Sequence, residues 1–367
     1  MRDFRSYPEL EIDFDGGPQL VVGRNAAGKT NLVEALTVLS LGRSHRTSTD
    51  AEMVGWGAPF ARLEAGLGLP AAGSLEVVLV APDSTTSASA RKRVKVNGVP
   101  RRPSALMEAL RTVLFAPEDM LLIAGSPGLR RSALDQLMVQ RVAQAASSLS
   151  TYTRALAQRN TLLRRIREEQ ASRDELPYWD GVLVQEGGQI VEWRLETLAA
   201  LAEPLVSAHR EIADDEGALR LRYLTNAPAR DGETPADALR RRLGETAEKE
   251  LWNGATLIGP HRDDVSFELD GRELSTFASR GQQRTAILAF KLAQVDLLSV
   301  IDGRPPLLLL DDVFSELDPV RRSHLVRRID GLPQSFITTT TPDDLDPALV
   351  AAATAWRVEP GHLRLAS

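Results

Sequence analysis

The chain of 367 residues contains no cysteine. This absence excludes disulfide bonds, thiolate nucleophiles and zinc sites with thiolate ligands. The chain also has no apolar run of the roughly 20 residues needed to span a bilayer. Its first seven residues lack the apolar stretch of a secretory signal. These absences favour a cytoplasmic protein without a membrane partner.

Aromatic residues make up only 5% of the chain, and the net charge at pH 7 is −6. Few aromatic residues disfavour recognition of single-stranded nucleic acid by base stacking. Exposed charges are screened beyond about 8 Å at physiological salt, so local arginine clusters matter more than the net charge. The length is sufficient for two domains, or for one domain with a substantial insertion.

The most informative segment is a complete phosphate loop with the sequence GRNAAGKT, between a short apolar strand and a helix. Its glycines allow backbone amides to surround phosphate groups, the lysine reaches the β- and γ-phosphates, and the threonine hydroxyl binds Mg²⁺. The alternative, a glycine-rich turn that only reverses the chain, leaves the Lys-Thr pair unexplained. The segment therefore predicts a nucleoside triphosphate site formed by Gly23, Arg24, Asn25, Ala26, Ala27, Gly28, Lys29 and Thr30.

A second part of this site follows the four leucines at 307–310, which predict a strand buried on both faces. Asp311 and Asp312 come where this strand ends. The alternative is an aspartate that only caps the strand end, and the presence of a phosphate loop in the chain disfavours it. We therefore expect Asp311 to bind Mg²⁺ together with Thr30. We expect Asp312 to orient the attacking water as the catalytic residue.

The pattern of the chain changes twice along its length. Residues 1–120 alternate short strands with turns, and Asn97-Gly98 favours a type I′ hairpin. Two helical tracts, at about 127–170 and 179–212, predict an antiparallel arm. We expect a first head segment at 1–120, a helical arm domain at 121–250 and a second head segment at 251–367. The expected strands are 11–14, 20–22, 75–80 and 94–96, followed in the arm by a linker at 226–235 and a helix at 236–251.

Ser279 and Gln282 form a capping box before a long amphipathic helix at 285–298. Such boxes begin many ordinary helices, so the box alone does not indicate a nucleotide contact. The order of the motifs along the chain does. A phosphate loop, a Ser-x-Gly-Gln helix start, a leucine strand with two acids and then a Ser-Glu-Leu-Asp segment is the order of ABC-type ATPases. This resemblance implies nucleotide contacts from a second subunit through Ser279, Gly281, Gln282 and Asp318.

The chain as a whole resembles the RecF family of bacterial recombination mediators, which are relatives of the SMC proteins. The phosphate loop and the Leu-Asp-Asp-Val-Phe-Ser-Glu-Leu-Asp string carry part of this resemblance. The Gly-Pro-His-Arg-Asp-Asp string is more selective than either nucleotide motif. The motifs that carry it are at 4–7, 23–30, 115–119, 127–131, 158–160, 259–264, 279–284 and 310–318.

The resemblance implies an α/β fold, an ABC-type ATPase head of the P-loop class with an inserted helical arm. It also implies an ATP- and Mg²⁺-dependent homodimer with two composite sites and slow, DNA-stimulated hydrolysis. DNA in duplex, gapped or junction form is the implied ligand. RecR is the implied protein partner, and RecO and RecA act in the same pathway.

Two positions depart from the usual family pattern. Ala26 stands where glycine is usual, and we expect its backbone to adopt a conformation that alanine tolerates. The segment at 336–341 lacks the histidine that ABC transporters place after this strand. We expect Thr338 or Thr339 to take part of its role.

Clusters of basic residues are the candidate DNA contacts. For any single cluster the alternative, a solvated charged surface paired with acids such as Glu168, is about equally favoured. Together the clusters predict contact with the phosphates of duplex DNA, blind to sequence. The candidates are Arg91, Lys92, Arg93, Lys95, Arg130, Arg131, Arg164 and Arg165.

Other functions remain open at this point. The nucleotide-binding subunit of a membrane transporter shares the motif order, but the long arginine-rich insertion and the missing histidine disfavour it. An ATPase-coupled nuclease is disfavoured, because such enzymes carry an added acidic metal-binding domain. An SMC-like architectural clamp is a further alternative. His261 has no partner at metal-ligand spacing, so we expect a structural or coupling role for it.

Overall fold

The computed structural model describes residues 1–68, 73–81, 92–213, 217–342 and 345–366, and these divide into two compact units. Unit 1 comprises Met1–Met120, Ser207–Asp214 and Ile287–Ser367. Unit 2 comprises Leu121–Val206 and Asp215–Ala286. Residues 251–286 belong to unit 2, because they contain strands that pair within that unit. The domain boundaries at 120 and 250 stay predictions.

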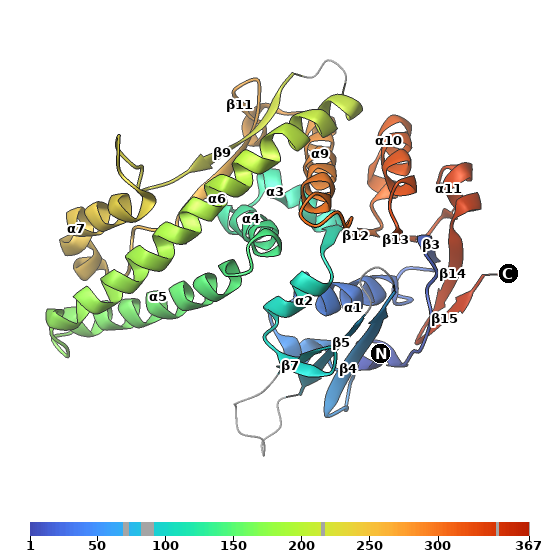
Figure 1. The fold of residues 1–367 in the computed structure, drawn as a ribbon, viewed down its shortest axis with the longest axis horizontal. Helices are drawn as coiled ribbons and strands as arrows, with labels where there is room; N and C mark the ends of the chain where they lie inside the picture. The colour runs from blue at the N-terminus through green and yellow to red at the C-terminus, as the bar shows by residue number, and fades with distance from the viewer. Residues whose placement is uncertain (69–72, 82–91, 214–216, 343–344, 367) are drawn as a thin grey trace. The chain divides into compact units, whose positions relative to one another are not determined.

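Two six-stranded sheets form the framework of unit 1 among the described residues (Figure 1). Sheet A is antiparallel, with the order β2-β1-β4-β5-β6-β7. Sheet B has the order β15-β14-β3-β13-β12-β8 and is parallel except for β15. The strands of sheet A are β1 (Arg2–Phe4), β2 (Tyr7–Glu9), β4 (Phe60–Leu67), β5 (Gly73–Val80), β6 (Lys92–Val96) and β7 (Val99–Arg101). The strands of sheet B are β3 (Gly17–Val22), β8 (Thr112–Phe115), β12 (Leu307–Asp311), β13 (Gln334–Thr339), β14 (Thr354–Glu359) and β15 (His362–Leu365).

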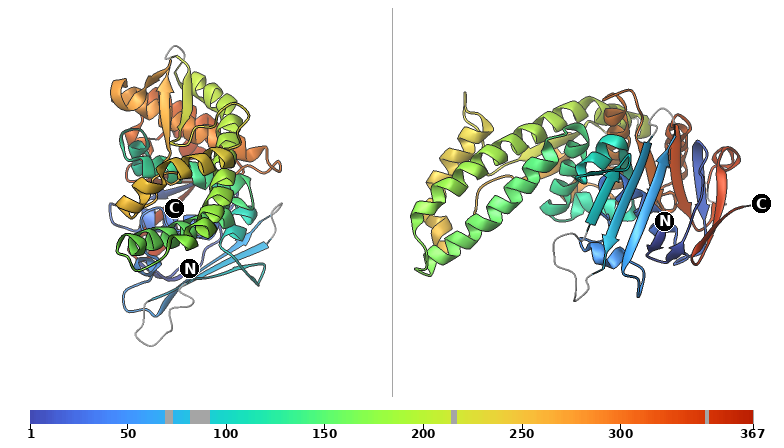
Figure 2. Two further views of the ribbon diagram at one scale, coloured as in Figure 1. Left: turned by 90° about the vertical axis from the view of Figure 1, so that its left-hand side faces the viewer. Right: turned by 60° about the horizontal axis from the view of Figure 1, so that its bottom comes forward.

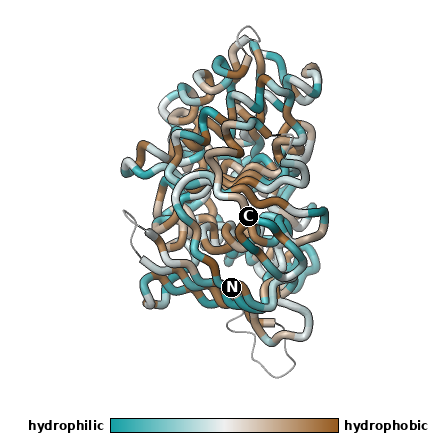
Figure 3. The backbone as a smooth tube through the Cα atoms, turned by 90° about the vertical axis from the view of Figure 1, so that its right-hand side faces the viewer, coloured by the Kyte–Doolittle hydropathy of each residue, from teal (hydrophilic) through white to brown (hydrophobic). Residues whose placement is uncertain are grey.

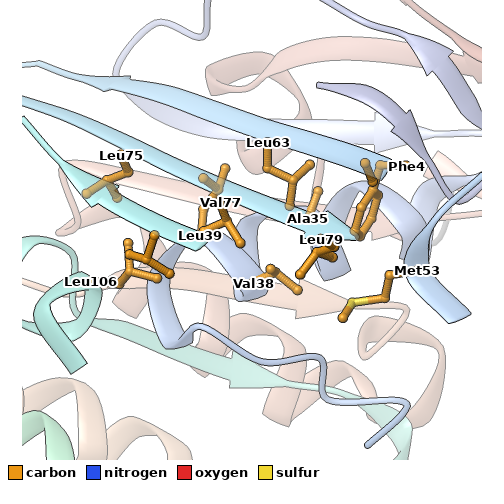
Figure 4. Close-up of a cluster of buried hydrophobic side chains, with 12 residues drawn as sticks. Phe4, Ala35, Val38, Leu39, Met53, Leu63, Leu75, Val77, Leu79 and Leu106 are labelled. Atoms are coloured by element: carbon orange, nitrogen blue, oxygen red, sulfur yellow. The ribbon is translucent and has the colours of Figure 1, made fainter. Parts of the chain in front are cut away.

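Helix α1 (Lys29–Leu41) contacts strands of both sheets of unit 1. Figure 4 shows Val38 and Leu39 of this helix beside Leu63, Val77 and Leu79 of sheet A. Burying each such side chain stabilises the fold by about 1.5–3 kcal/mol. The other helices of unit 1 are α2 (Ser104–Ala109), the larger part of α9 (Arg280–Ser299), α10 (Pro319–Asp330) and α11 (Pro347–Ala352).

Most of the strand predictions are confirmed in unit 1. The leucine run forms β12, every residue of which is buried, between β8 and β13. Asn97 and Gly98 have φ of 54° and 74° and connect β6 to β7, as the type I′ hairpin prediction requires.

The predicted strand at 11–14 is wrong, because this segment is irregular. Its alternating apolar residues instead pack over sheet B without backbone pairing. Phe14 lies edge-on to Phe336 at 4.8 Å and to Trp356 at 5.3 Å, measured between ring centroids. Tertiary packing therefore accounts for the alternation that the sequence analysis attributed to a strand.

Unit 2 contains the predicted helical arm. Helix α5 (Ala145–Arg167) and helix α6 (Leu176–Ile212), most of which belongs to this unit, run in opposite directions from a common turn in Figures 1 and 2. Leu183 of α6 packs with Tyr152 of α5, and Asp180 pairs with Arg159. The remaining elements are α3 (Leu121–Ala124), α4 (Pro127–Arg141), α7 (Pro235–Asn253), α8 (Leu274–Phe277), and the three-stranded sheet of β9 (Leu219–Leu224), β10 (Asp264–Leu269) and β11 (Arg272–Glu273).

The first helical tract is interrupted rather than continuous. Helix α4 ends at Arg141, Val142 adopts an extended conformation, and α5 begins at Ala145. The apolar periodicity crosses this turn because Met138 and Ala145 contribute to the same buried cluster.

Hydrophilic and hydrophobic residues alternate along the helices in Figure 3, the pattern of helices that bury one face. Across the described part of the chain, no helix combines the length and hydropathy that crossing a membrane requires.

Candidate functional site

The phosphate loop connects β3, in the interior of sheet B, to α1. Gly28 precedes the helix with φ of 117°, and a Cβ atom there would lie 3.1 Å from the Tyr7 hydroxyl oxygen. Ala26 has φ of 63°, in the left-handed region. Alanine adopts this conformation at a cost of about 1 kcal/mol, so the loop accommodates Ala26 with an energetic penalty of that size.

Lys29 is the first residue of α1 and is only 7% exposed. Its ammonium donates hydrogen bonds to the carbonyl oxygens of Gly23 at 2.8 Å and Arg24 at 3.1 Å. Burial lowers the pKa of Lys29, while the carboxylates of Asp312 and Asp311 act in the opposite direction. The charge of Lys29 is therefore held close to the amides that would surround a phosphate.

Thr30 and Asp311 meet as predicted, although they are far apart in the sequence. The Thr30 hydroxyl donates to Oδ1 of Asp311 at 3.2 Å. The hydroxyl of Thr338 donates to the same oxygen at 2.7 Å. Hydroxyl and carboxylate oxygens are the ligands that Mg²⁺ takes together with phosphate oxygens and water, so these residues fit that ion.

Asp312 follows β12 with φ of 54°, a left-handed conformation. Its amide donates to the Thr338 hydroxyl at 2.9 Å. Burial raises the pKa of Asp312; Lys29 lowers it, and Asp311 and Glu316 raise it further. A raised pKa makes this carboxylate a better proton acceptor, which suits the orientation of a water molecule.

Thr338 therefore orients both acids at once, because its hydroxyl contacts Asp311 and the amide of Asp312. Thr339 takes part differently, since its carbonyl accepts from the amide of Gly23 at 3.3 Å. Whether either residue replaces the missing histidine stays a prediction.

Glu34 on α1 is a residue that sequence reasoning missed. It is 0% exposed and accepts two hydrogen bonds from the Arg5 guanidinium at 2.8 and 2.7 Å. Ser44 donates to it at 2.5 Å. Burial alone would raise the pKa of Glu34. The hydrogen bonds from Arg5 and Ser44, together with the positive charges of Arg5 and Arg46, outweigh burial and lower this pKa.

This cluster explains the motif at 4–7. Arg5 binds the buried face of α1, and the Tyr7 hydroxyl donates to the carbonyl oxygen of Gly28 at 3.2 Å. Burial raises the pKa of Tyr7 to about 12. The signal available in the sequence was an acid, Glu34, among the apolar positions of an amphipathic helix.

The predicted capping box is present in unit 2. The amide of Ser279 donates to the Gln282 side chain at 3.0 Å, and the amide of Gln282 donates to the Ser279 hydroxyl at 3.2 Å. Ser279 is exposed. In unit 1, Asp318 accepts from the amide of Arg321 at 3.0 Å and begins α10. The contacts of Ser279, Gly281, Gln282 and Asp318 with a second subunit stay predictions.

The DNA candidates differ in how strongly the protein holds them. Lys92 pairs with Asp50 at 2.8 Å and donates to the carbonyl oxygen of Gly42 at the end of α1. Lys95 pairs with Glu76 at 2.8 Å. In unit 2, Arg130 binds Asp264, and Arg131 donates to the carbonyl oxygen of Asp263.

Arg93, Arg164 and Arg165 are exposed, and the two arm arginines donate to carbonyl oxygens of Asn160 and Gln170 near their own helix. Arg91 lies outside the described residues. DNA contact by any of these side chains stays a prediction.

Comparisons with known proteins identify one family over most of the chain. A family model described as the RecF/RecN/SMC N terminal domain matches residues 1–355. The chain is 38% identical over 368 residues to the DNA replication and repair protein RecF of Bacillus subtilis (strain 168), covering 99% of this chain and 98% of that protein. It is 41% identical over 349 residues to RecF of Symbiobacterium thermophilum, covering 93% and 90%.

Solved structures give the same result. The recombination mediator protein RecF-ATPrS in the RecFOR pathway matches with a TM-score of 0.88 at 29% identity, covering 100% of this chain and 96% of that chain. The RecF-ATP structure matches with a TM-score of 0.86 at the same identity, with the same coverage. An SMC head bound to the C-terminal winged-helix domain of ScpA matches at 0.53 with 15% identity, covering 100% and 94%. The SMC head therefore shares the fold only.

Proposed function

The chain belongs to the RecF family of DNA replication and repair proteins, within the RecF/RecN/SMC group, and on this premise we propose that it is an ATP-dependent recombination mediator. The observation that carries the proposal is the meeting of Thr30, from the phosphate loop, with Asp311, at the end of the buried strand, at 3.2 Å. This pairing supports the proposal because it brings together two candidate site residues that are 281 positions apart in the sequence.

ATP binding rests on the groups around the phosphate loop. Lys29 supplies a charge for the β- and γ-phosphates, and the N-terminal amides of α1 lack a side-chain cap, which leaves them available for an anion. Thr30 and Asp311 would hold Mg²⁺, which supplies neutralisation of phosphate charge. Asp312 would orient the attacking water.

Slow hydrolysis follows from the length of the Asp312 side chain. Most transporter ATPases have glutamate at this position, and aspartate is one methylene shorter. Because a displacement of about 1 Å can cost about 10²-fold in rate, a water held by Asp312 reacts slowly. ATP then persists long enough to hold two subunits together.

Dimerisation is assigned to Ser279, Gly281, Gln282 and Asp318, which would complete a site held by the other subunit. We expect Ser279→Arg to retain ATP binding and to abolish ATP-induced dimers, because a long cation replaces a small hydroxyl facing the nucleotide. Light scattering with saturating Mg·ATP measures the dimers, and a fluorescent nucleotide titration measures binding. Undiminished dimers would remove Ser279 from the interface.

The DNA ligand is assigned to duplex or gapped DNA, contacted through phosphates by exposed arginines such as Arg93, Arg164 and Arg165. RecR is the proposed protein partner, with RecO and RecA acting in the same pathway at single-stranded gaps. Binding assays with gapped, duplex and single-stranded DNA, with and without ATP, test this assignment. Tightest binding to the single-stranded substrate would contradict it.

A second candidate is an SMC-like architectural clamp in which hydrolysis does not matter, and the fold shared with SMC heads favours considering it. Asp312→Asn separates the two functions, because it preserves shape and removes the proton acceptor. Normal DNA repair by cells that carry Asp312→Asn would favour the clamp, and failed repair would favour a hydrolysing mediator.

A further inference from the structure

Three motifs of unit 2 that the nucleotide site does not use lie together. Arg130 of α4 donates two hydrogen bonds to Asp264, at 2.8 and 2.7 Å, at the start of β10. Asn160 of α5 accepts hydrogen bonds from the amide and hydroxyl of Thr256, both at 2.7 Å. Arg131 donates to the carbonyl oxygen of Asp263 at 2.7 Å. Nε2 of His261 lies 3.3 Å from the carbonyl oxygen of Thr256, which connects these contacts. The segments at 127–131, 158–160 and 259–264 therefore form one polar network.

Arg194 of α6 is a buried charge in this network, with its side chain 3% exposed. It donates to both carboxylate oxygens of Asp135 on α4, at 2.8 and 2.9 Å. It also donates to the carbonyl oxygen of Pro260 at 2.8 Å and to the hydroxyl of Tyr223 on β9 at 3.2 Å. One guanidinium thus links α4, α6, β9 and the loop before β10.

The loop at 259–263 is in close contact with helix α5 of the arm. The Tyr152 hydroxyl of α5 lies 2.7 Å from Nδ1 of His261. Gly259 has φ of 130°, and a Cβ atom there would lie 2.4 Å from the Tyr152 oxygen. Glycine is therefore required for this approach, which holds the loop against α5.

Through β10, β11 and α8, the same loop leads to the segment that carries Ser279, Gly281 and Gln282, which is called the signature segment below. Strand β10 begins at Asp264 and pairs with β11, which is followed at once by α8 and then by Ser279. Helix α8 contacts β10, β11 and α3, and α4 contacts β10. A displacement of β10 from α4 would therefore displace the start of α9.

We propose that Arg130 with Asp264, and Arg194 with Asp135, are positioning residues that hold Ser279 in a defined place relative to the arm helices. Arg130 thereby acts through Asp264 on the signature segment and does not contact DNA phosphates. The proposal rests on the dimerisation assigned above and adds a link between the arm and the residues that close the dimer.

Arg130→Lys is the sharpest test, because lysine keeps the positive charge but cannot make the two parallel bonds to Asp264. The full chain carrying this change should bind ATP as the wild type does, while the dissociation constant of its ATP-induced dimer should be at least tenfold higher than that of the wild type. Asp264→Asn and Asp135→Asn should give the same separation. A carboxylate does not bind phosphate, so a DNA-contact role for Arg130 predicts no such defect in Asp264→Asn.

A second measurement does not depend on dimers. Amide hydrogen exchange of peptides covering 274–284, in the monomer without nucleotide, should become at least fivefold faster in Arg130→Lys. Arg173→Lys is the matched control, because Arg173 forms an exposed ion pair with Glu248 in the same unit. It should change neither the exchange nor the dimer.

Unchanged exchange in Arg130→Lys would overturn the proposal even if dimers weaken, because the signature segment would then not be held by this residue. Wild-type dimers with wild-type exchange in Asp264→Asn would overturn it as well. Should the wild-type chain itself fail to dimerise with ATP, the proposed function fails, while the exchange measurement still decides whether Arg130 positions the segment.

Discussion

At the scale of single residues, the nucleotide site depends on backbone conformations that most residues adopt at a cost. Ala26 and Asp312 have φ of 63° and 54°, in the left-handed region. Residues held in this way cost about 1–3 kcal/mol each and cluster at functional sites. The surrounding hydrogen bonds, such as that from the Asp312 amide to Thr338, retain the strained geometry.

Lys29→Met should weaken ATP binding by about tenfold or more, because a hydrogen bond to a charged group contributes about 1.5–3 kcal/mol. Methionine retains an unbranched side chain and lacks only the terminal ammonium, so the fold should persist. Titration with a fluorescent ATP analogue measures the affinity. Equal affinity in the variant and the wild type would exclude Lys29 from the site.

Because of the buried His261, we expect the folded chain to lose stability in acid. Burial lowers its pKa from 6.5 to about 4 in the folded chain; a hydrogen bond to the Thr256 carbonyl partly offsets this. Because the folded-state pKa is below the unfolded one, its stabilising contribution is complete above pH 6.5 and is lost as the pH falls toward 4. Between pH 7 and pH 5 the free energy of unfolding should fall by about 2 kcal/mol from this group.

Urea unfolding at the two pH values measures this difference in the wild type and in His261→Gln, which should lose less. His362 is exposed on β15, so His362→Gln is the control and should keep the wild-type difference. An equal loss in wild type and His261→Gln would assign the acid sensitivity to other groups.

At the scale of elements, the N-termini of helices α1 and α7 differ in how their first backbone amides are satisfied. Helix α1 begins at Gly28 without a side-chain cap, which leaves its amides available for phosphate. Helix α7 has a complete capping box, in which Thr234 accepts from the amide of Asp237 and Asp237 accepts from the amide of Thr234. The structural helix satisfies its own amides, and the helix of the site does not.

Thr234→Ala should lower the free energy of unfolding by about 1 kcal/mol, because it removes an N-cap acceptor. The midpoint of urea denaturation measures the change. Glu248→Ala, on the same helix, is the control and should change stability by less than about 0.5 kcal/mol, because its ion pair with Arg173 is exposed. Equal effects of the two substitutions would show that the cap contributes nothing specific.

At the scale of the whole molecule, an acidic chain is proposed to bind an acidic polymer. The net charge of −6 makes non-specific attraction to DNA weak, so binding must come from local groups of arginine. Arg164 and Arg165, near the end of α5, are exposed members of such a group.

The double variant Arg164→Gln with Arg165→Gln should reduce the slope of log DNA affinity against log salt by about 2, since each phosphate contact contributes about 0.9. Fluorescence anisotropy with duplex DNA over a series of salt concentrations measures the slope. Arg173→Gln is the control, because Arg173 is already paired with Glu248. A slope equal to that of the wild type would place the DNA contacts elsewhere.

Much of the fold could be predicted because its signals are local. The phosphate loop, the strand at 307–311, the hairpin at 97–98 and the capping box at 279–282 each lie within a few consecutive residues. The chemistry of such segments is set by backbone periodicity, turn residues and neighbouring side chains. The irregular segment at 11–14 was predicted wrongly because its alternation arises from contact with Phe336 and Trp356.

By itself, the sequence determined the family, the order of the motifs and the residue types of the nucleotide site. Only the tertiary structure decided the pairings between distant residues: Glu34 with Arg5, Thr338 with Asp311, and Arg130 with Asp264. The physical reason is that a buried charge must find a partner in space. No local pattern states which of the many arginines and carboxylates along the chain will meet.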